Sequence, residues 1–464
     1  MDMGAIPFDL TTVNIVAASP DSINFELNHD TLGIRIDYTG ALSFDWVFTN
    51  VPDWVSFIEV NETRSFSDSF NVVIEREFCD FGINQHNVVI SGGSVDQILY
   101  IEGHREYFGP VWYVSNDGND FDGYGTSEAP FQNIGHAIDI SSSGDTIIAM
   151  PGTYVESLNI QKNLYIRGLN HPDSTILQSI GDNYNNFTIE NTDSVKISNL
   201  TYDNKLYAHN VTKVIIDSVH HNSDYHGQNI SVDGVANVEL LNSNFIIPTN
   251  NSGSFIYSSG ATRFIISNIN ASMSDGPSQH GYSINLNNSY AEIHNSNFFE
   301  MGGILNPIDS LIIKNSVFRN GNHRAITNES GDDYVFIENC DFSGYKASNR
   351  GLIDLQQGHI VLDSTRFIGN NFIDGASAIK SDNGSIIATN CSFINNSGGQ
   401  EYWQGSVIMT HLSEPYSSFD NCIFYNNEGF VFSGPNSSSS ASGQINITNC
   451  IIYGNEVGDN IWIN

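Results

Sequence analysis

Polar and apolar residues follow a repeating pattern from Ile197 to the end of the chain. A short phrase such as I-E-N-C-D-F, residues 337–342, returns every 19 to 31 residues in different surroundings. The apolar residues that open the copies, here called the anchors, are Ile197, Ile216, Leu240, Ile266, Ile293, Ile313, Ile337, Leu362, Ala388, Phe419 and Ile447. Recurrence at such a period is typical of a solenoid, in which each repeat packs on its neighbours.

The spacing of the anchors suits a coil of three short strands and three turns. Leucine-rich repeats have a similar period, but their L-x-x-L-x-L skeleton is missing here. Less regular coils are expected earlier, around Ile148, Ile166 and Ile189. About fourteen coils stacked at the strand spacing of about 4.8 Å would form a rod of about 65 Å. The pattern therefore predicts an all-β fold, a parallel β-helix.

Two columns follow the anchors at fixed distances. Two residues after the anchor stand Asn199, Ser218, Asn242, Asn268, Asn295, Asn315, Asn339, Ser364, Asn390, Asn421 and Asn449. Asn tolerates the left-handed backbone of a tight turn, and stacked amides can bond along a column. Five residues after the anchor stand Tyr202, His221, Phe245, Phe298, Phe318, Phe342, Phe367, Phe393 and Phe424. We expect both columns to point inward, with the rings stacked.

Four of the five cysteines share one position of the repeat, three residues after an anchor. They are Cys340, Cys391, Cys422 and Cys450. Their spacing matches no zinc-binding pattern, and a free Cys packs well as a small apolar side chain. We therefore expect buried thiols rather than a metal site or a disulfide framework.

The beginning of the chain has a different texture. Residues 12–103 contain alternating strand-like runs at 22–27, 32–36, 70–74 and 97–101, separated by Gly, Asn, Asp and Ser. This rhythm is typical of a small Ig-like β-sandwich. The predicted domains are an extended or disordered segment at 1–11, the sandwich at 12–103, a linker at 104–110 and the β-helix at 111–464.

The segment FDWVFTNVPDWVSF, residues 44–57, carries a resemblance. Trp46, Pro52 and Trp54, followed by alternating strands, resemble the BACON-type sandwich at the front of Bacteroidetes secreted proteins. The resemblance implies carbohydrate or mucin association, and it is equally compatible with a spacer. Trp46 and Trp54 could stack on a glycan, but a Trp in an alternating strand usually packs inward, so we favour the core.

A second resemblance lies in residues 115–154. The elements G-T-x-x-x-P-F and G-D-T-I-x-φ-x-P-G-x-Y, in this order, resemble the opening of pectate-lyase-like right-handed parallel β-helix proteins. The resemblance implies that fold and a capping helix near 130–140. Phe131, Ile134 and Ile138 would form its apolar stripe, with Pro130 in the first turn and Gly144 beyond its end. Such a helix would cover the open edge of the first coil.

The charge of the chain narrows the possible partners. Lys and Arg total 17 against 52 Asp and Glu, a formal net charge of −35. Nucleic acids and anionic membranes need a basic footprint, so we expect neither as a partner. Unaided binding of polyanionic glycans is disfavoured as well. No apolar run approaches the 18 or so residues of a membrane span, so we expect no membrane insertion.

Localisation is inferred from composition. The acidic, Asn/Ser/Gly-rich chain is typical of an extracellular or cell-surface protein. Residues 1–10 lack the basic start and apolar stretch of a signal peptide. We expect a mature region from which a signal peptide, and a C-terminal sorting segment, have been removed.

Three groups of residues are candidates for chemistry or ligand binding. Clustered carboxylates at Asp117, Asp120 and Asp122 suit calcium, although the same residues serve turns, and the spacing is not that of an EF-hand. His220, Asp224 and His226 could carry acid–base or metal chemistry, or form a plain surface patch. Arg319, His323 and Arg324 form the best basic group, and no coil pairs a Lys with a nearby Arg recognisably.

Function is expected in the insertions between repeats, because the core of a repeat rod is generic. Tyr402 and Trp403 lie in one insertion and could stack on sugar rings. The leading hypothesis is a non-catalytic, adhesin-type rod that contacts an extracellular polysaccharide or cell-surface glycan. The alternatives are a polysaccharide lyase or glycoside hydrolase acting in the β-helix groove, and a structural spacer or self-associating filament subunit.

Overall fold

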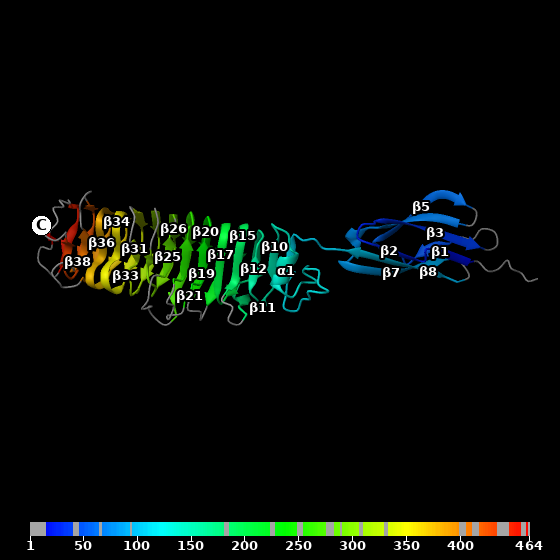
Figure 1. The fold of residues 1–464 in the computed structure, drawn as a ribbon, viewed down its shortest axis with the longest axis horizontal. Coiled ribbons are helices and arrows are strands. Elements are labelled where there is room, and N and C mark those ends of the chain that lie inside the picture. Colours follow the sequence, from blue (N-terminus) through cyan, green and yellow to red (C-terminus); the bar gives the residue numbers. More distant parts are fainter. Residues whose placement is uncertain are drawn as a thin grey trace, which may run out of the picture. The chain divides into compact units, whose positions relative to one another are not determined.

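The structure is a computed structural model that describes residues 15–39, 46–64, 67–92, 95–180, 185–222, 228–247, 254–274, 283–287, 290–305, 310–328, 333–398, 405–410, 417–433, 445–455 and 461–462. The chain forms two compact units, Met1–Phe108 and Gly109–Asn464 (Figure 1). No helix among these described residues is long and apolar enough to cross a bilayer.

The first unit is a β-sandwich of two four-stranded sheets. One sheet has the order β1 (Ile15–Ser19), β3 (Thr31–Thr39), β6 (Ser67–Ile74), β5 (Val55–Arg64). The other has the order β2 (Ser22–Phe25), β8 (Gln97–Arg105), β7 (Gly82–Ser91), β4 (Val47–Thr49). A short 3-10 turn, η1 (Arg76–Phe78), precedes β7. Because β8 continues to Arg105, the first residues of the predicted linker are paired strand residues.

Alternation of side chains builds the core of the sandwich. Ile34 and Ile36 on β3 and Val88 and Ile90 on β7 are buried with exposed or half-buried residues between them, as the period of a strand requires. Trp46 and Trp54 are partly buried against this core, in agreement with the preferred interpretation of both residues.

The second unit is a right-handed parallel β-helix, which confirms the predicted fold class. Each coil contributes strands to three ladders of parallel strands, and the coils follow one another along the unit (Figure 1). The anchor sheet contains β9 (Val111–Val114), β10 (Thr146–Ala149), β13 (Leu164–Gly168), β15 (Asn185–Ser198), β17 (Lys205–Asp217), β20 (Asn237–Leu241), β23 (Arg263–Ser267), β26 (Tyr290–His294), β29 (Ser310–Lys314), β32 (Asp333–Glu338), β34 (Lys346–Asp363), β36 (Asn371–Thr389), β39 (Ser417–Asp420) and β42 (Ile445–Thr448).

From β10 onward, the chain continues from each anchor strand into the second ladder, here called the short-strand sheet. It contains β11 (Gly152–Val155), β14 (Thr175–Gln178), β16 (Thr201–Tyr202), β18 (His220–Asn222), β21 (Asn244–Ile247), β24 (Asn270–Met273), β27 (Asn297–Phe299), β30 (Val317–Arg319), β33 (Asp341–Ser343), β35 (Arg366–Ile368), β37 (Ser392–Ile394), β40 (Ile423–Tyr425) and β43 (Ile451–Tyr453).

The third ladder returns the chain to the next anchor. It uses parts of the long strands β15, β17, β34 and β36 together with β12 (Leu158–Ile160), β19 (Ile230–Asp233), β22 (Ile256–Ser259), β25 (Ile284–Asn287), β28 (Ile304–Leu305), β31 (Ile326–Asn328), β38 (Gly405–Thr410), β41 (Phe430–Ser433) and β44 (Ile461–Trp462).

The anchors form one column of paired residues. Ile166 pairs with Ile197, and each anchor from Ile197 to Ile447 then pairs with the next. Two earlier assignments were wrong. The residue that pairs with Ile166 is Ile147 rather than Ile148, and Ile189 lies in the third ladder, where it pairs with Ile160.

The residues two positions after the anchors all have a left-handed backbone, as predicted, with φ between 49° and 57° from Asn199 to Asn449. Several of their amides bond along the column, as Asn339 does to Asn315 over 2.8 Å. The column lies at a mostly exposed turn and not inside the rod. The next residue is the one that points inward, as buried Ser243, Ser316 and Cys340 show.

The aromatic column is confirmed. Phe298, Phe318, Phe342, Phe367, Phe393 and Phe424 stack with ring centroids 4.7 to 5.3 Å apart and planes within 17° of parallel. The described cysteines are all free, and four of the five are buried, with Cys450 partly exposed. The interior is therefore a file of rings and small side chains.

A short helix, α1 (Ile134–Ile140), packs against β9, β10 and β12 at the first coil. Its buried residues include the predicted Ile134 and Ile138, but it starts after Pro130, which is not in its first turn. Glu156 accepts hydrogen bonds from the backbone N–H groups of Ile134 and Gly135. Lys162 donates to three carbonyls at its other end. Opposite charges thus stabilise the two ends of this helix.

Candidate functional site

A groove of about 560 Å³ lies on the outer face of the short-strand sheet. It crosses β14 to β27 and is bordered at one end by a 3-10 turn, η2 (Pro172–Ser174). Its lining residues are Asp173, Ile176, Thr201, His220, His221, Asn222, Asn244, Phe245, Ile246, Asn270, Ala271, Ser272, Asn297 and Phe299. Its size is within the range of sites that bind small molecules or parts of a polymer.

Strand alternation places one polar file in this groove. His220, Asn244, Asn270 and Asn297 each stand one residue before the inward column and pair with one another across successive coils. Because neighbouring residues of a strand face opposite sides, these side chains must point outward. We call these four residues the amide file.

The amide file is joined end to end by hydrogen bonds. Nδ2 of Asn297 donates to Oδ1 of Asn270 over 2.8 Å, and Nδ2 of Asn270 donates to Oδ1 of Asn244 over 3.1 Å. Nδ2 of Asn244 lies 3.0 Å from Nε2 of His220. Since the amide nitrogen can only donate, Nε2 accepts and the His220 proton is on Nδ1.

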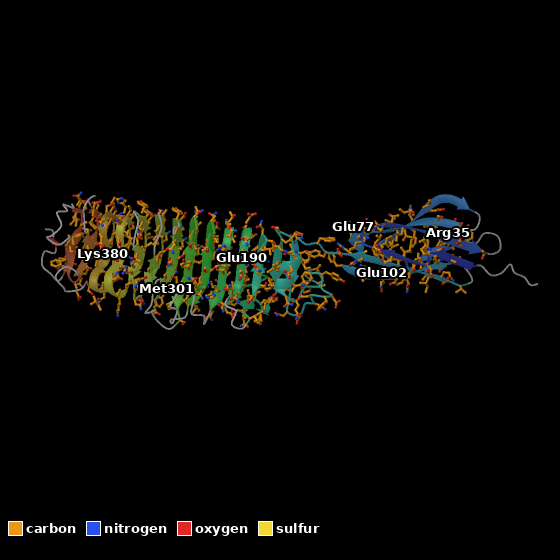
Figure 2. The ribbon with its side chains drawn as sticks, in the orientation of Figure 1. Arg35, Glu77, Glu102, Glu190, Met301 and Lys380 are labelled. Atoms are coloured by element: carbon orange, nitrogen blue, oxygen red, sulfur yellow. The ribbon has the colours of Figure 1, made fainter. Side chains whose placement is uncertain are left out.

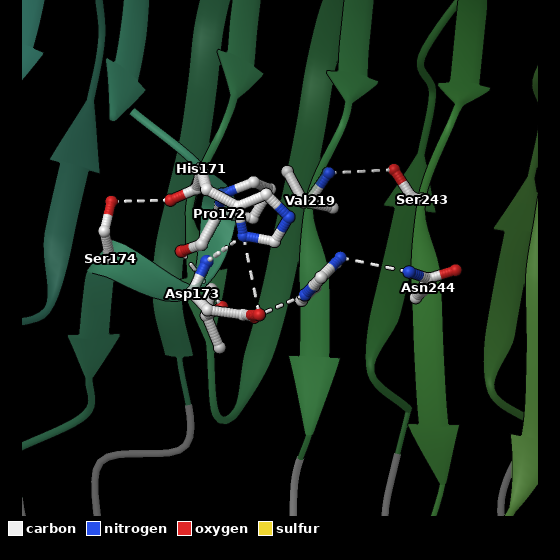
Figure 3. Close-up of polar contacts among 9 residues, drawn as sticks. His171, Pro172, Asp173, Ser174, Val219, Ser243 and Asn244 are labelled. Atoms are coloured by element: carbon white, nitrogen blue, oxygen red, sulfur yellow. Dashed lines mark hydrogen bonds and ion pairs between the residues drawn. The ribbon is translucent and has the colours of Figure 1, made fainter. Parts of the chain in front are cut away.

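Asp173, which lies in the turn η2 and not on a strand of the sheet, forms a hydrogen bond with the last residue of the file. Nδ1 of His220 donates to Oδ1 of Asp173 over 2.5 Å, a contact drawn with that of Asn244 in Figure 3. The ring of His171 meets that of His220 edge-on, with centroids 5.5 Å apart. Thr201 donates from its hydroxyl to the carbonyl of Pro172 and so holds the turn that carries Asp173. A carboxylate therefore orients the imidazole at this end of the groove.

Apolar side chains form the other border. Ile246 and Phe299 lie two positions after residues of the amide file, on the same outer face, and are 44% and 43% exposed. Between their strands, Ala271 takes the place of an aromatic ring in the inward column. The groove thus sets neutral amides beside an exposed ring and an aliphatic side chain.

The groove contains few charged side chains. Among the described residues that line the groove, Asp173 is the only carboxylate, and there is no Lys or Arg. The arrangement can donate and accept many hydrogen bonds to neutral groups, and it holds one His–Asp pair capable of moving a proton.

The predicted histidine cluster is only partly described. His220 projects into the groove, whereas His221 is buried between Tyr202 and Phe245 in the ring column, as expected from its position. Burial lowers the pKa of His221 to about 3. The hydrogen bond between Nδ1 and the carbonyl of Tyr202 acts in the opposite direction and raises the pKa by less. Asp224 and His226 lie outside the described residues, as do Tyr402 and Trp403.

The predicted basic group is divided between two carboxylates. Arg319, on the short-strand sheet, lies 3.7 Å from Asp341, which also pairs with Arg366. Arg324 lies 3.3 Å from the buried Asp354. Burial lowers the pKa of His323, and the neighbouring Arg324 lowers it further.

The prediction that no coil pairs a Lys with a nearby Arg concerned single coils. Across different coils, one Lys and one Arg approach the same carboxylate. Lys380, labelled in Figure 2, lies 3.6 Å from the same Asp354 that Arg324 approaches. Arg324, Asp354 and Lys380 are far apart in sequence but lie on three successive coils. Two cations compensate one buried carboxylate, and Lys380 also pairs with Asp382 at 2.6 Å.

The three aspartates proposed for calcium have separate contacts. Asp120 accepts from the backbone N–H groups of Gln132 and Asn133 and from the Asn133 side chain. Burial alone would raise the pKa of Asp120, but these hydrogen bonds outweigh it and lower the pKa. Asp122 accepts from Asn119. Within the described ranges, no three His, Cys, Asp or Glu side chains gather to hold a metal ion. Calcium binding by Asp117, Asp120 and Asp122 stays a prediction.

Sequence reasoning named His220 but missed Asn244, Asn270, Asn297 and Asp173. A signal for the amides was present, because all three stand four residues after an anchor. In a rod whose fifth position points inward, the fourth must face solvent. Asp173 lies outside this spacing, and no periodic pattern connects it to His220.

No family model and no curated protein matches the chain. Among solved structures, it is similar to a GH136 lacto-N-biosidase from Eubacterium ramulus, with 10% identity, a TM-score of 0.28, and coverage of 74% of this chain and 68% of that chain. Pectin methylesterase PemA from Erwinia chrysanthemi has 11% identity and a TM-score of 0.24, covering 76% and 92%. A rhamnogalacturonan lyase has 13% identity and a TM-score of 0.27, covering 75% and 87%. These TM-scores support no inference about function, and the fold assignment rests on the strand pairing above.

Proposed function

We propose that this protein is an extracellular or cell-surface β-helix that binds a neutral glycan in the groove without catalysis. The observation that carries the proposal is the amide file, which runs across four coils beside Phe299. Successive amides are one strand spacing apart, about 4.8 Å, so an extended polymer can meet several of them in turn.

The amides suit sugar hydroxyls. An Asn side chain has two N–H donors and two lone pairs. Along the file, Asn244 and Asn270 each donate one hydrogen bond and accept one. One donor and one acceptor per amide are left for a ligand, and a hydroxyl can satisfy both. The bonds along the file also hold the amides in place, which reduces the entropy lost on binding.

The apolar border suits the C–H faces of sugar rings. Phe299 and Ile246 are exposed beside polar groups, which is the usual composition of a small-molecule site. A neutral ligand is favoured over a polyanion because the chain carries a formal charge of −35 and the described lining contains no cation.

The lining also disfavours hydrolysis or elimination. A glycosidase of the common type needs two carboxyl groups about 5 to 10 Å apart, and the described lining offers Asp173 alone. Nε2 of His220, the atom that would take a proton from a substrate, already accepts from Asn244.

A glycan array probed with the full chain, followed by calorimetry on the bound glycan, tests the proposal. Phe299→Ala should weaken binding about tenfold, the effect of losing one ring contact of roughly 1.4 kcal/mol. Tyr425→Ala is the matched control, because Tyr425 lies in the same outward column outside the groove and is 45% exposed. Equal effects of the two variants, or no bound glycan on the array, would contradict the proposal; the latter favours a spacer.

Catalysis is the second candidate, and the bond between Asp173 and His220 favours it. A carboxylate that orients a histidine is a common arrangement for a general base. Incubation with a panel of polysaccharides, followed by assays for unsaturated and reducing ends, tests it. Turnover that is lost in His220→Ala would replace the binding function by an enzymatic one.

A further inference from the structure

The β-sandwich contains a second pocket, of about 540 Å³. It opens between β4, at the edge of one sheet, and β5 and β6 of the other. Four aromatic and two acidic side chains dominate its lining: Tyr38, Trp46, Phe48, Phe70, Glu59 and Asp68. This combination of rings and carboxylates does not occur in the β-helix groove and indicates a different ligand.

Three of the rings form adjoining walls. Trp46 meets Phe48 at 84° and Phe70 at 82°, and Phe48 meets Phe70 at 85°, with centroids 5.1 to 5.4 Å apart. Rings in a flat row would suit the face of a sugar. Rings at right angles can contact a compact group from more than one side. One face of Phe48 is covered by Phe57, whose ring centroid is 3.8 Å away, which leaves its other face for a ligand. All three are only partly buried, so part of each ring remains accessible.

Two carboxylates make the pocket negatively charged. Glu59 on β5 is exposed and Asp68 on β6 is half-buried. The pocket lining contains no Lys, Arg or His. Among the ion pairs of the described side chains, none involves Glu59 or Asp68.

We infer that this pocket binds a quaternary ammonium group. A cation over an aromatic face is attracted by the quadrupole of the ring, most strongly by Trp. A primary ammonium is strongly hydrated and needs acceptors for its three N–H groups. A quaternary ammonium has no N–H group to satisfy and gains from both the rings and the two carboxylates. The ligand could be a free choline-like cation or the same group on a lipid headgroup.

Calorimetry on the full chain separates the possibilities. Choline chloride should bind at millimolar or lower concentration, whereas 3,3-dimethyl-1-butanol, a neutral molecule of the same shape, should not. Binding to phosphatidylcholine vesicles in a flotation assay, beyond binding of free choline, would identify the headgroup as the source. Binding of choline alone would identify the free cation.

Variants test the residues. Glu59→Gln with Asp68→Asn should weaken choline binding about tenfold, since each exposed or half-exposed charge contributes on the order of 0.7 kcal/mol. Asp21→Asn with Asp53→Asn removes the same charge from exposed positions of the sandwich outside the pocket and should leave binding unchanged. Trp46→Phe keeps the packing of the ring and should weaken binding about threefold.

Several results would overturn the inference. They are the absence of choline binding, equal binding of the neutral analogue, an equal loss in the two charge variants, and competition by a neutral glycan at this pocket. The last result would make the aromatic pocket a sugar site. None of these results depends on the glycan groove of the β-helix, so the two proposals fail separately.

Discussion

Asn244 donates a hydrogen bond from Nδ2 to Nε2 of His220 over 3.0 Å. The bond determines which nitrogen of His220 carries the proton. Because Nε2 accepts, Nδ1 carries the proton and donates to Asp173. Asn270 and Asn297 donate in the same direction, toward the histidine. A protonated His220 could not accept from Asn244, so the state of one imidazole is coupled to the orientation of the whole file.

Replacement of Asn244 by Asp should therefore change His220. A carboxylate cannot donate to Nε2, and it can instead accept from an Nε2–H group. Nitrogen NMR of the labelled, neutral imidazole should show the tautomer with its proton on Nδ1 in the native protein and a loss of that preference in Asn244→Asp. Asn297→Asp adds the same charge two coils away and should keep the Nδ1–H tautomer. A proton on Nε2 in the native protein would contradict the assigned direction.

The ring stack predicts a large difference in stability effect between an inward and an outward phenylalanine. Phe342 is fully buried between Phe318 and Phe367, whereas Phe299 is 43% exposed on the groove side of its strand. Phe342→Ala should lower the free energy of unfolding by about 3 to 5 kcal/mol, and Phe342→Leu by less. Phe299→Ala should change it by less than about 1 kcal/mol. Urea unfolding followed by circular dichroism measures all three, and equal losses at the two sites would refute the assigned faces.

Much of the β-helix could be predicted because its repeat imposes one requirement per position. An inward site needs an apolar side chain and a left-handed turn needs Asn, Gly or a small polar residue, so both columns are visible in the sequence. The same reasoning failed at the first coil. Ile147, Ile148 and Ala149 are three consecutive buried residues, and a continuous apolar run does not indicate which member belongs to the column.

The groove was harder to predict than the core. Outward positions tolerate most residues, so Asn244, Asn270 and Asn297 differ from ordinary surface residues only when they are aligned by anchor. Asp173 comes from a turn 47 residues before His220, and only the stacking of coils brings the two together. The pairing of Lys380 and Arg324 with Asp354 could not be predicted from the sequence for the same reason.

The left-handed turns predict an inverted preference between Gly and Ala. At Asn339, where φ is 51°, Ala would incur a backbone cost of about 1 to 2 kcal/mol that Gly avoids. Asn339→Gly should therefore unfold at a higher urea concentration than Asn339→Ala. At Asn297, a strand residue outside the left-handed set, the order should reverse by about 0.5 to 1 kcal/mol. The same order at both positions would show that backbone strain does not select Asn in the turns.

His221 predicts how the β-helix responds to acid. Burial holds its pKa at about 3 in the folded protein, whereas an unfolded chain has the ordinary value of about 6.5. Between these values the unfolded chain binds more protons, so the free energy of unfolding should fall as the pH falls, by up to about 1.4 kcal/mol per pH unit. Above pH 6.5 both states are neutral and the stabilisation is complete.

The variant His221→Phe isolates this effect, because a ring is retained between Tyr202 and Phe245 while the titrating group is removed. It loses the bond to the Tyr202 carbonyl, which shifts its stability at every pH by a similar amount of about 1 kcal/mol. Urea unfolding of both proteins from pH 7 to pH 4.5 should therefore give curves that converge or cross as the pH falls. Carboxylates such as Glu292, whose pKa is about 2, are present in both proteins, so their contribution cancels in the difference. Parallel curves over this range would mean that the His221 site is hydrated or opens on protonation, and that its burial does not control acid stability.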